Sequence, residues 1–172
     1  MRIVAGSLRG RRFDAPSGTA TRPSSDFVRE SAFNLVGPLE AAEVCDLYAG
    51  SGGLGLEALS RGAASCLFVD SSGRACATIE ANLARLGLEA RVLRRDVITA
   101  LSLEQRPFDL VLCDPPYDLD PARALAPQLV RLLAPDGLVV YQSPARIEPE
   151  LAGLALTTSR RYGSARLTLF QH

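Results

Sequence analysis

Residues 46–63 read D-L-Y-A-G-S-G-G-L-G-L-E-A-L-S-R-G-A, in which Gly50, Gly52 and Gly55 have the spacing G-x-G-x-x-G. Such a turn brings backbone close to a ligand and leads from a strand into a helix, as in dinucleotide-binding proteins. A Walker-type phosphate-binding loop is excluded because no G-K-[S/T] follows the glycines. The stretch therefore predicts a ligand that contains a nucleoside, and the residues around the turn must identify it.

The segments around this turn alternate between apolar strands and amphipathic helices. Near-continuous apolar strands are typical of a parallel sheet with helices on both faces, so we expect an α/β fold with a mainly parallel sheet. The expected strands are residues 44–49, 66–70, 90–96, 108–114 and 138–143. The expected helices are residues 53–61, a segment with Cys76, Ile79, Leu83 and Leu86 at helical spacing, and residues 124–133, ended by Pro135-Asp136-Gly137.

The two ends of the chain depart from this alternation. Residues 2–5 and 11–14 predict a small basic β-hairpin at the N-terminal end. Residues 154–160 and 166–170, joined by the turn 162–164, predict an antiparallel hairpin on the edge of the sheet.

A helix is also expected after the first hairpin and a loop. Ser24 or Ser25 can cap it, and Gly37-Pro38 ends it. Its apolar side is expected to contain Phe27, Ala32, Phe33 and Val36.

Length and composition indicate one domain. The chain has 172 residues, of which 47% are hydrophobic, enough for a single core. We expect residues 1–24 to form a basic N-terminal hairpin and loop, and residues 25–172 to form the catalytic core. Neither a long uncharged apolar run nor a signal-like segment is present. We therefore expect a cytoplasmic monomer without membrane contact.

Cysteine and histidine usage argues against several chemistries. The four cysteines form no C-x-x-C pair, and we expect them to be buried small hydrophobes. The only histidine is His172, which argues against serine-histidine hydrolysis and a histidine-built metal site. We expect no metal.

Three aspartates stand where expected strands end, and they select the ligand. Asp70 follows Gly50 by twenty residues, the distance at which a carboxylate binds the ribose of either NAD or S-adenosylmethionine. Asp46 would repel a pyrophosphate, whereas it favours the ammonium and sulfonium groups of S-adenosylmethionine. Asp96 is either a surface acid or an acceptor for the adenine amino group. The cofactor residues predicted from this pattern are Asp46, Gly50, Ser51, Gly52, Gly55, Asp70 and Asp96.

A second motif, D-P-P-Y at residues 114–117, follows the fourth apolar strand. The carboxylate of Asp114 and the carbonyl of Pro115 can accept both hydrogens of an exocyclic amine and so direct its lone pair toward a methyl donor. Pro115 and Pro116 stiffen the backbone, and Tyr117 offers a ring for a planar target to stack on. We therefore expect these four residues to be catalytic, although a loop that merely ends a strand has the same composition.

The chain resembles a known family at these motifs and at two others, R-I-V-A-G-S-L-R-G-R-R-F (residues 2–13) and R-P-S-S-D-F-V-R-E-S-A-F-N (residues 22–34). It is similar to the bacterial 16S rRNA guanine-N2 methyltransferases of the RsmD type. The resemblance implies a Rossmann-like class I methyltransferase that uses S-adenosylmethionine to methylate one guanine in 16S rRNA or in the assembling small ribosomal subunit. Two positions depart from the family pattern, since Phe27 replaces an arginine and Asp70 a glutamate.

The basic N-terminal arm is then expected to bind RNA. Residues 1–30 contain six arginines and three acids, and a basic arm on a neutral protein can hold RNA at one place. The residues expected to contact phosphates are Arg9, Arg11, Arg12, Arg22 and Arg29. Deletion of residues 1–13 is expected to abolish RNA methylation and to preserve cofactor binding.

Other functions remain open at this point. A DNA amine methyltransferase or a protein glutamine methyltransferase can use a similar loop, although the latter commonly begins it with asparagine. A cofactor-binding ribosome assembly factor without catalytic activity, and a dehydrogenase, are further alternatives.

Overall fold

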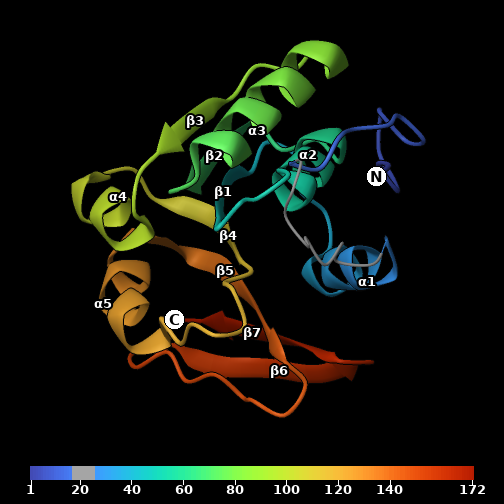
Figure 1. The fold of residues 1–172 in the computed structure, drawn as a ribbon. Coiled ribbons are helices and arrows are strands. Elements are labelled where there is room, and N and C mark those ends of the chain that lie inside the picture. Colours follow the sequence, from blue (N-terminus) through green and yellow to red (C-terminus); the bar gives the residue numbers. More distant parts are fainter. Residues whose placement is uncertain (17–25) are drawn as a thin grey trace.

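A central seven-stranded sheet organises the computed structural model, which describes residues 1–16 and 26–172 (Figure 1). The strand order is β3-β2-β1-β4-β5-β7-β6. The first five strands are mutually parallel, whereas β7 is antiparallel to both of its neighbours. The strands are β1 (Glu43–Leu47), β2 (Ser65–Asp70), β3 (Arg91–Arg94), β4 (Phe108–Cys113), β5 (Leu133–Pro144), β6 (Ala155–Tyr162) and β7 (Ala165–Gln171).

The strand order reverses beside β1. From β1 the chain moves outward to β2 and β3 on one side, and then returns to β4 and β5 on the other. Both β2 and β4 pair with β1 in parallel register. In open α/β sheets, ligands bind outside the carboxyl ends of the strands at such a reversal. The topology therefore places the expected site beyond the ends of β1 and β4.

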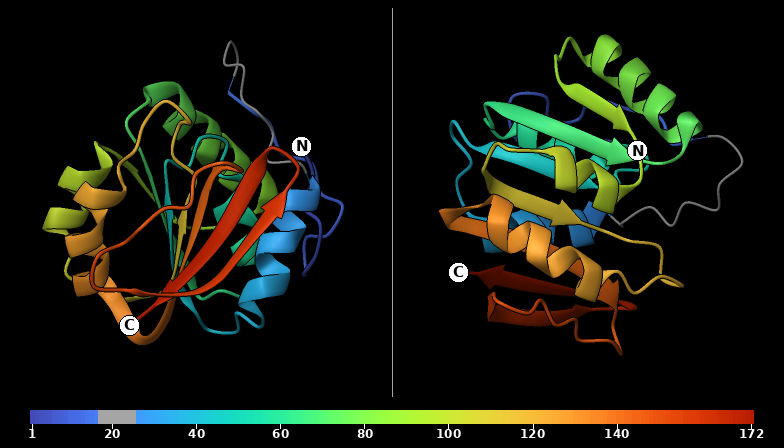
Figure 2. Two further views of the ribbon diagram at one scale, coloured as in Figure 1. Left: turned by 90° about the horizontal axis from the view of Figure 1, so that it is seen from below. Right: turned by 90° about the vertical axis from the view of Figure 1, so that its left-hand side faces the viewer.

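Helices cover both faces of the sheet, as Figure 2 shows with the sheet seen nearly edge-on. One buried cluster joins α1, α2 and α3 to one face, and a second joins α4 and α5 to the other. Each fully buried aliphatic or aromatic side chain contributes about 1.5–3 kcal/mol. The helices are α1 (Asp26–Val36), α2 (Gly53–Ser60), α3 (Gly73–Leu86), α4 (Val97–Leu103) and α5 (Ala122–Leu132).

These elements confirm the predicted α/β fold and the C-terminal antiparallel hairpin. Helix α3 buries Cys76, Ile79, Leu83 and Leu86 as their spacing predicts. All four cysteines are buried and unbridged. No helix among the described residues has the length and apolarity needed to cross a membrane.

One helix was missed and one prediction about an element was wrong. No helix was predicted where α4 lies; its sequence V-I-T-A-L-S-L is short, and β-branched residues weaken a helical pattern. Residues 135–137 were expected to end a helix, but they lie within β5, which begins at Leu133 directly after α5. The pairing of β4 with β5 shifts register between Phe108 and Leu110 and so accommodates these residues.

The N-terminal segment is part of the core. It turns back on itself through one antiparallel bridge, Arg2 with Arg12, and buries Ile3 and Phe13 in the cluster that contains α1, α2 and α3. The predicted caps Ser24 and Ser25, and the boundary at residues 24 and 25, lie outside the described residues.

Candidate functional site

A cavity of about 1180 Å³ lies at the carboxyl ends of the parallel strands. Pockets for small ligands are usually about 300–1,000 Å³, so this one has room for more than a single cofactor. Its lining follows the strand order of the sheet, from the end of β2 through β1, β4 and β5 to the turn between β6 and β7.

Asp46 lies at the bottom of this cavity, inside β1. Its side chain is buried, and one carboxylate oxygen accepts a hydrogen bond from the Gly55 N–H at 2.8 Å. Burial raises the pKa of Asp46 well above its ordinary value, the Gly55 N–H opposes this, and the nearby Asp114 and Asp70 raise the pKa further. A carboxylate held in this way, beside two others, favours a positively charged ligand group.

Asp70 connects the end of β2 to the glycine turn. One of its oxygens accepts the Gly50 N–H at 2.8 Å, and the other accepts the Ser72 N–H at 2.8 Å. Both Asp70 and Gly50 line the cavity. A carboxylate oxygen can accept more than one hydrogen bond, so these contacts fix the orientation of Asp70 and leave it able to bind a ribose hydroxyl.

The glycines of the turn have different roles. Gly50 and Ser51 line the cavity, as expected of cofactor residues. Gly52 and Gly55 are not among the residues that line the cavity, and their contact with the cofactor stays a prediction. A Cβ on Gly55 would lie 2.3 Å from the Phe68 ring, so this glycine allows α2 to pack closely on β2. Gly52 adopts φ 77° as the N-cap of α2, a conformation that suits glycine.

Tyr48 is a lining residue that sequence analysis did not identify. Its φ of 57° is left-handed, a strained conformation for a side-chain-bearing residue and one that is concentrated at functional sites. In the turn that follows, Gly50 is also left-handed, at φ 56°.

Asp96 lies apart from this group. It is exposed and caps helix α4, where its Oδ1 accepts the Thr99 N–H at 2.9 Å and the Thr99 hydroxyl at 3.0 Å. The Thr99 N–H is the principal contact that lowers the pKa of Asp96. Asp96 is not among the residues that line the cavity, and its contact with adenine stays a prediction.

The D-P-P-Y loop enters the cavity from the end of β4, and all four of its residues line it. The Asp114 N–H points to the Leu47 carbonyl of β1 at 3.5 Å. Pro115 is buried, and the Asp114 and Tyr117 side chains are partly exposed. The loop thus lies beside the strand-end carboxylates of Asp46 and Asp70 and also reaches solvent.

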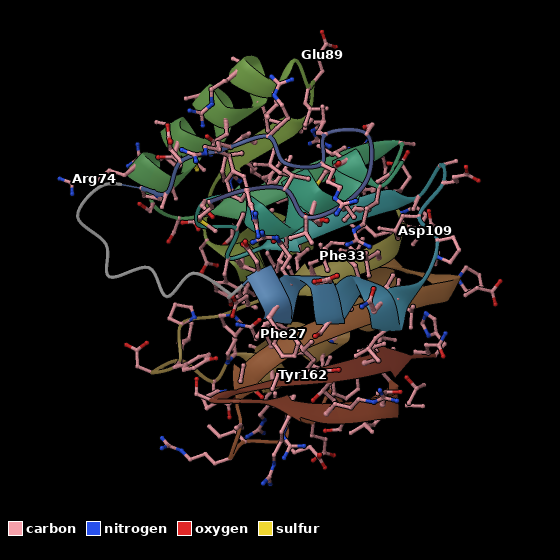
Figure 3. All side chains as sticks on the ribbon, turned by 90° about the vertical axis from the view of Figure 1, so that its right-hand side faces the viewer. Phe27, Phe33, Arg74, Glu89, Asp109 and Tyr162 are labelled. Atoms are coloured by element: carbon pink, nitrogen blue, oxygen red, sulfur yellow. The ribbon has the colours of Figure 1, made fainter. Side chains whose placement is uncertain are left out.

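Beyond the loop, three further lining residues were missed by sequence analysis. Gln142, on β5, is 7% exposed, and the residues preceding Gln142 and Asp114, namely Tyr141 and Cys113, are register partners. Phe27 and Tyr162 approach each other across the rim, as Figure 3 shows. Phe27 was expected on the apolar side of its helix, but it is 63% exposed.

The arginines expected to hold phosphates are separated by the fold. Arg9, Arg11 and Arg12 are exposed on the N-terminal hairpin, and Arg11 donates to the Arg85 carbonyl at 3.2 Å. Arg22 lies outside the described residues. Arg29 is 1% exposed and lies in the wall of the cavity, away from the exposed hairpin arginines, and its contact with an RNA phosphate stays a prediction.

Arg29 takes part in a buried ion pair that anchors the hairpin. It lies 3.5 Å from Glu57, which is fully buried on α2, and donates to the Arg2 carbonyl at 2.6 Å. Glu57 accepts the N–H groups of Val4 and Ala5 at 2.8 and 2.9 Å. The sequence signal for this contact was Glu57, a charged residue at an apolar position of α2. The signal does not identify the partners of Glu57, because they lie far from it in the sequence.

The described residues contain no cluster of three or more potential metal ligands. The donor set instead suits S-adenosylmethionine, since a buried carboxylate, a ribose-distance carboxylate and a glycine turn face one cavity.

Comparison with known proteins finds similarity to one family and to methyltransferases. Residues 1–171 match a family described as "Conserved hypothetical protein 95". The chain is 39% identical to "Putative rRNA methyltransferase YlbH" of Bacillus subtilis, covering 99% of this chain and 98% of that protein. It is 34% identical to "Ribosomal RNA small subunit methyltransferase D" of Escherichia coli, covering 88% of this chain and 75% of that protein. The solved structure of "Putative methyltransferase yhhF" from Escherichia coli is 32% identical, with a TM-score of 0.83 over 100% of this chain and 97% of that one.

Proposed function

The chain belongs to the family described as "Conserved hypothetical protein 95", the RsmD family of ribosomal RNA methyltransferases, and from this premise we propose that it methylates a guanine in 16S rRNA. The acceptor is the exocyclic N2 amine, and the methyl donor is S-adenosylmethionine. The observation that carries the proposal is the position of D-P-P-Y, which shares one cavity with Asp46, Asp70 and the glycine turn.

Different residues of the cavity bind different parts of the methyl donor. Asp46 faces the positively charged part of the donor, and Asp70 is placed to accept the ribose hydroxyls. When bound, S-adenosylmethionine supplies an electrophilic methyl group. Correct alignment of two reacting groups can account for roughly 7–11 kcal/mol of a barrier, so fixing the geometry is the main task of this site.

Asp114 and the carbonyl of Pro115 prepare the amine. Its lone pair is delocalised into the ring of the base, which makes the nitrogen a poor nucleophile. Acceptance of both amino hydrogens directs the lone pair toward the methyl group, and Tyr117 stacks on the base. The methylated nitrogen is transiently cationic and loses its proton readily, so no strong general base is required.

The test is methyl transfer from radiolabelled donor to four acceptors: unmodified small ribosomal subunits, free rRNA, DNA and total protein. Nucleoside analysis of the product follows. We expect label in N2-methylguanine of 16S rRNA. Label confined to DNA or glutamine would contradict the proposal, and the absence of any transfer would favour an assembly factor without catalytic activity.

Asp114→Ala tests the assigned mechanism. A hydrogen bond to a charged group contributes about 1.5–3 kcal/mol, so we expect methyl transfer to fall roughly ten- to hundredfold. Binding of S-adenosylhomocysteine, measured by calorimetry, should change little. Wild-type turnover in this variant would refute the role of Asp114.

A further inference from the structure

A partly exposed aromatic pair forms the end of the cavity that lies farthest along the sheet from the cofactor residues. Phe27 comes from the first turn of α1 and Tyr162 from the end of β6, and their ring centroids are 5.9 Å apart with an interplanar angle of 72° (Figure 3). The Phe27 side chain is 63% exposed and, within residues 1–16 and 26–172, it is the only aromatic among the large exposed hydrophobic residues.

The geometry of the pair holds it in place without covering it. An edge-to-face contact stabilises two rings and leaves ring surface available to a third planar group. The contact also joins α1 to the C-terminal hairpin, two elements that are far apart in the sequence. The pair is therefore a fixed platform at the rim of the cavity.

Strand spacing indicates which part of a substrate can reach this platform. Asp114 follows β4 and Tyr162 ends β6, and three intervals separate these strands in the order β4-β5-β7-β6. With neighbouring strands about 4.8 Å apart, this amounts to roughly 14 Å. That distance exceeds the width of one base, so a guanine seated at D-P-P-Y leaves the platform to a neighbouring nucleotide.

The charges around the platform suit nucleic acid. Arg160 is exposed two residues before Tyr162, on the same face of β6 because side chains alternate along a strand. On the other side, the Arg2 side chain is 70% exposed and forms an ion pair at 3.1 Å with Asp26, which adjoins Phe27, so a phosphate there would compete with this carboxylate. Aromatic rings flanked by arginines bind single strands, since the rings stack on bases and the arginines contact phosphates.

We propose that Phe27 and Tyr162 stack on an unpaired base next to the methylated guanine and so hold the RNA strand while the target base occupies the D-P-P-Y loop. This inference rests on the proposed function. The two residues act on strand binding and not on the reacting amine.

Ring removal tests the platform in Phe27→Ala and Tyr162→Ala, with Phe27→Trp and Tyr162→Phe as variants that keep a ring. Leu103→Ala is the control, because Leu103 is 62% exposed on α4, outside the cavity. Stacking of one base corresponds to about five- to hundredfold in affinity. We expect each alanine variant to raise KM for unmodified small subunits by that factor, with kcat and S-adenosylhomocysteine affinity changed less than about threefold. The ring-retaining variants should behave as wild type.

A binding assay separates this inference from the proposed function. Single-stranded RNA with 2-aminopurine beside a guanine is titrated with each variant, and stacking quenches its fluorescence. We expect quenching by the wild type, Phe27→Trp and Leu103→Ala, and its loss in Phe27→Ala. This pattern supports the platform even if the wild type methylates no RNA, a result that would refute the proposed function alone. Wild-type quenching and KM in both alanine variants would overturn the platform, as would a loss of kcat at unchanged KM.

Discussion

The cofactor half of the cavity and its substrate half are built in opposite ways. In the cofactor half, Asp46 binds the Gly55 N–H and Asp70 binds the Gly50 N–H, contacts that span 9 and 20 residues of sequence. In the substrate half, the walls come from distant parts of the chain, as in the contact between the Phe27 and Tyr162 rings. One half is therefore a local motif, and the other depends on the assembled fold.

This difference changes how the N-terminal arm must be tested. Deletion of residues 1–13 was expected to spare cofactor binding. However, Ile3 and Phe13 are each 1% exposed in the core, and Met1 lines the cavity itself. The deletion would damage both halves, so single substitutions are needed to separate them.

The buried ion pair offers the largest effect. Glu57→Ala removes the acceptor of the Val4 and Ala5 N–H groups and the partner of Arg61, whereas Arg29 keeps its contact with Asp26. Each buried donor left without an acceptor costs about 1–3 kcal/mol, so the variant should lower the free energy of unfolding by about 2–6 kcal/mol and release the hairpin from α2. Urea denaturation measures the first effect. Methyl transfer to small subunits, compared with S-adenosylhomocysteine binding at low temperature, measures the second.

Asp14→Ala is the matched control on the same hairpin. Asp14 pairs with Arg85 at 2.9 Å, but its side chain is 74% exposed, and exposed pairs contribute about 0–1 kcal/mol. Equal free energies of unfolding in the two variants would show that Glu57 does not anchor the hairpin. If Glu57→Ala lost cofactor binding and RNA methylation to the same degree, the substrate half would not depend on Glu57 more than the cofactor half does.

Asp46 provides the next test, within the cofactor half. Its pKa is raised well above the ordinary value by burial and by the neighbouring Asp114 and Asp70. A positively charged ligand group favours the ionised form, so cofactor affinity should rise with pH through this raised pKa and then level off. Calorimetry in buffers of different ionisation enthalpy should detect a proton released on binding.

The same pKa has the opposite consequence for the protein without cofactor. Because the folded-state pKa exceeds the unfolded value, the contribution of Asp46 to stability is fully present at pH below the unfolded pKa and is lost as pH rises through the folded pKa. Asp46→Asn keeps an oxygen for the Gly55 N–H and removes the charge. We expect it to weaken cofactor binding about tenfold, by roughly the low end of a charge-assisted contact, and to flatten both pH profiles. An unchanged pH dependence would contradict the charge-based role.

The contrast between the halves also explains what the sequence could predict. The parallel sheet, Asp46, Asp70 and D-P-P-Y could be predicted because hydrophobic periodicity fixes the strands, and residues at their ends meet at one edge. Gln142 and Tyr162 could not, since they join the cavity only through the pairing of β5, β7 and β6. The exposure of Phe27 and the burial of Arg29 could not be predicted either, because a helical pattern does not reveal which neighbours cover each side.

Asp96 lies at a strand end as Asp46 and Asp70 do. It therefore tests whether every acid at a strand end binds the cofactor, and its substitution has the smallest expected effect on stability and cofactor affinity. Its Oδ1 caps α4 through Thr99, and a lost cap typically costs about 1 kcal/mol. A carboxylate has acceptor capacity beyond two such bonds, so capping and an adenine contact are compatible. Asp96→Ala should remove both.

Asp96→Ser separates the two roles, because serine caps a helix nearly as well as aspartate but is too short to replace the carboxylate at the adenine. We expect thermal unfolding of the serine variant to match the wild type, while its affinity for S-adenosylhomocysteine falls a few-fold, as in the alanine variant. Full affinity in Asp96→Ser would leave Asp96 as a helix cap only, and the strand-end pattern would then identify two of the three acids as cofactor residues. Sequence analysis did not predict α4 and therefore could not identify Asp96 as its N-cap. That outcome would show that an acid at a strand end can be assigned to a cofactor only after a helix-capping role has been tested.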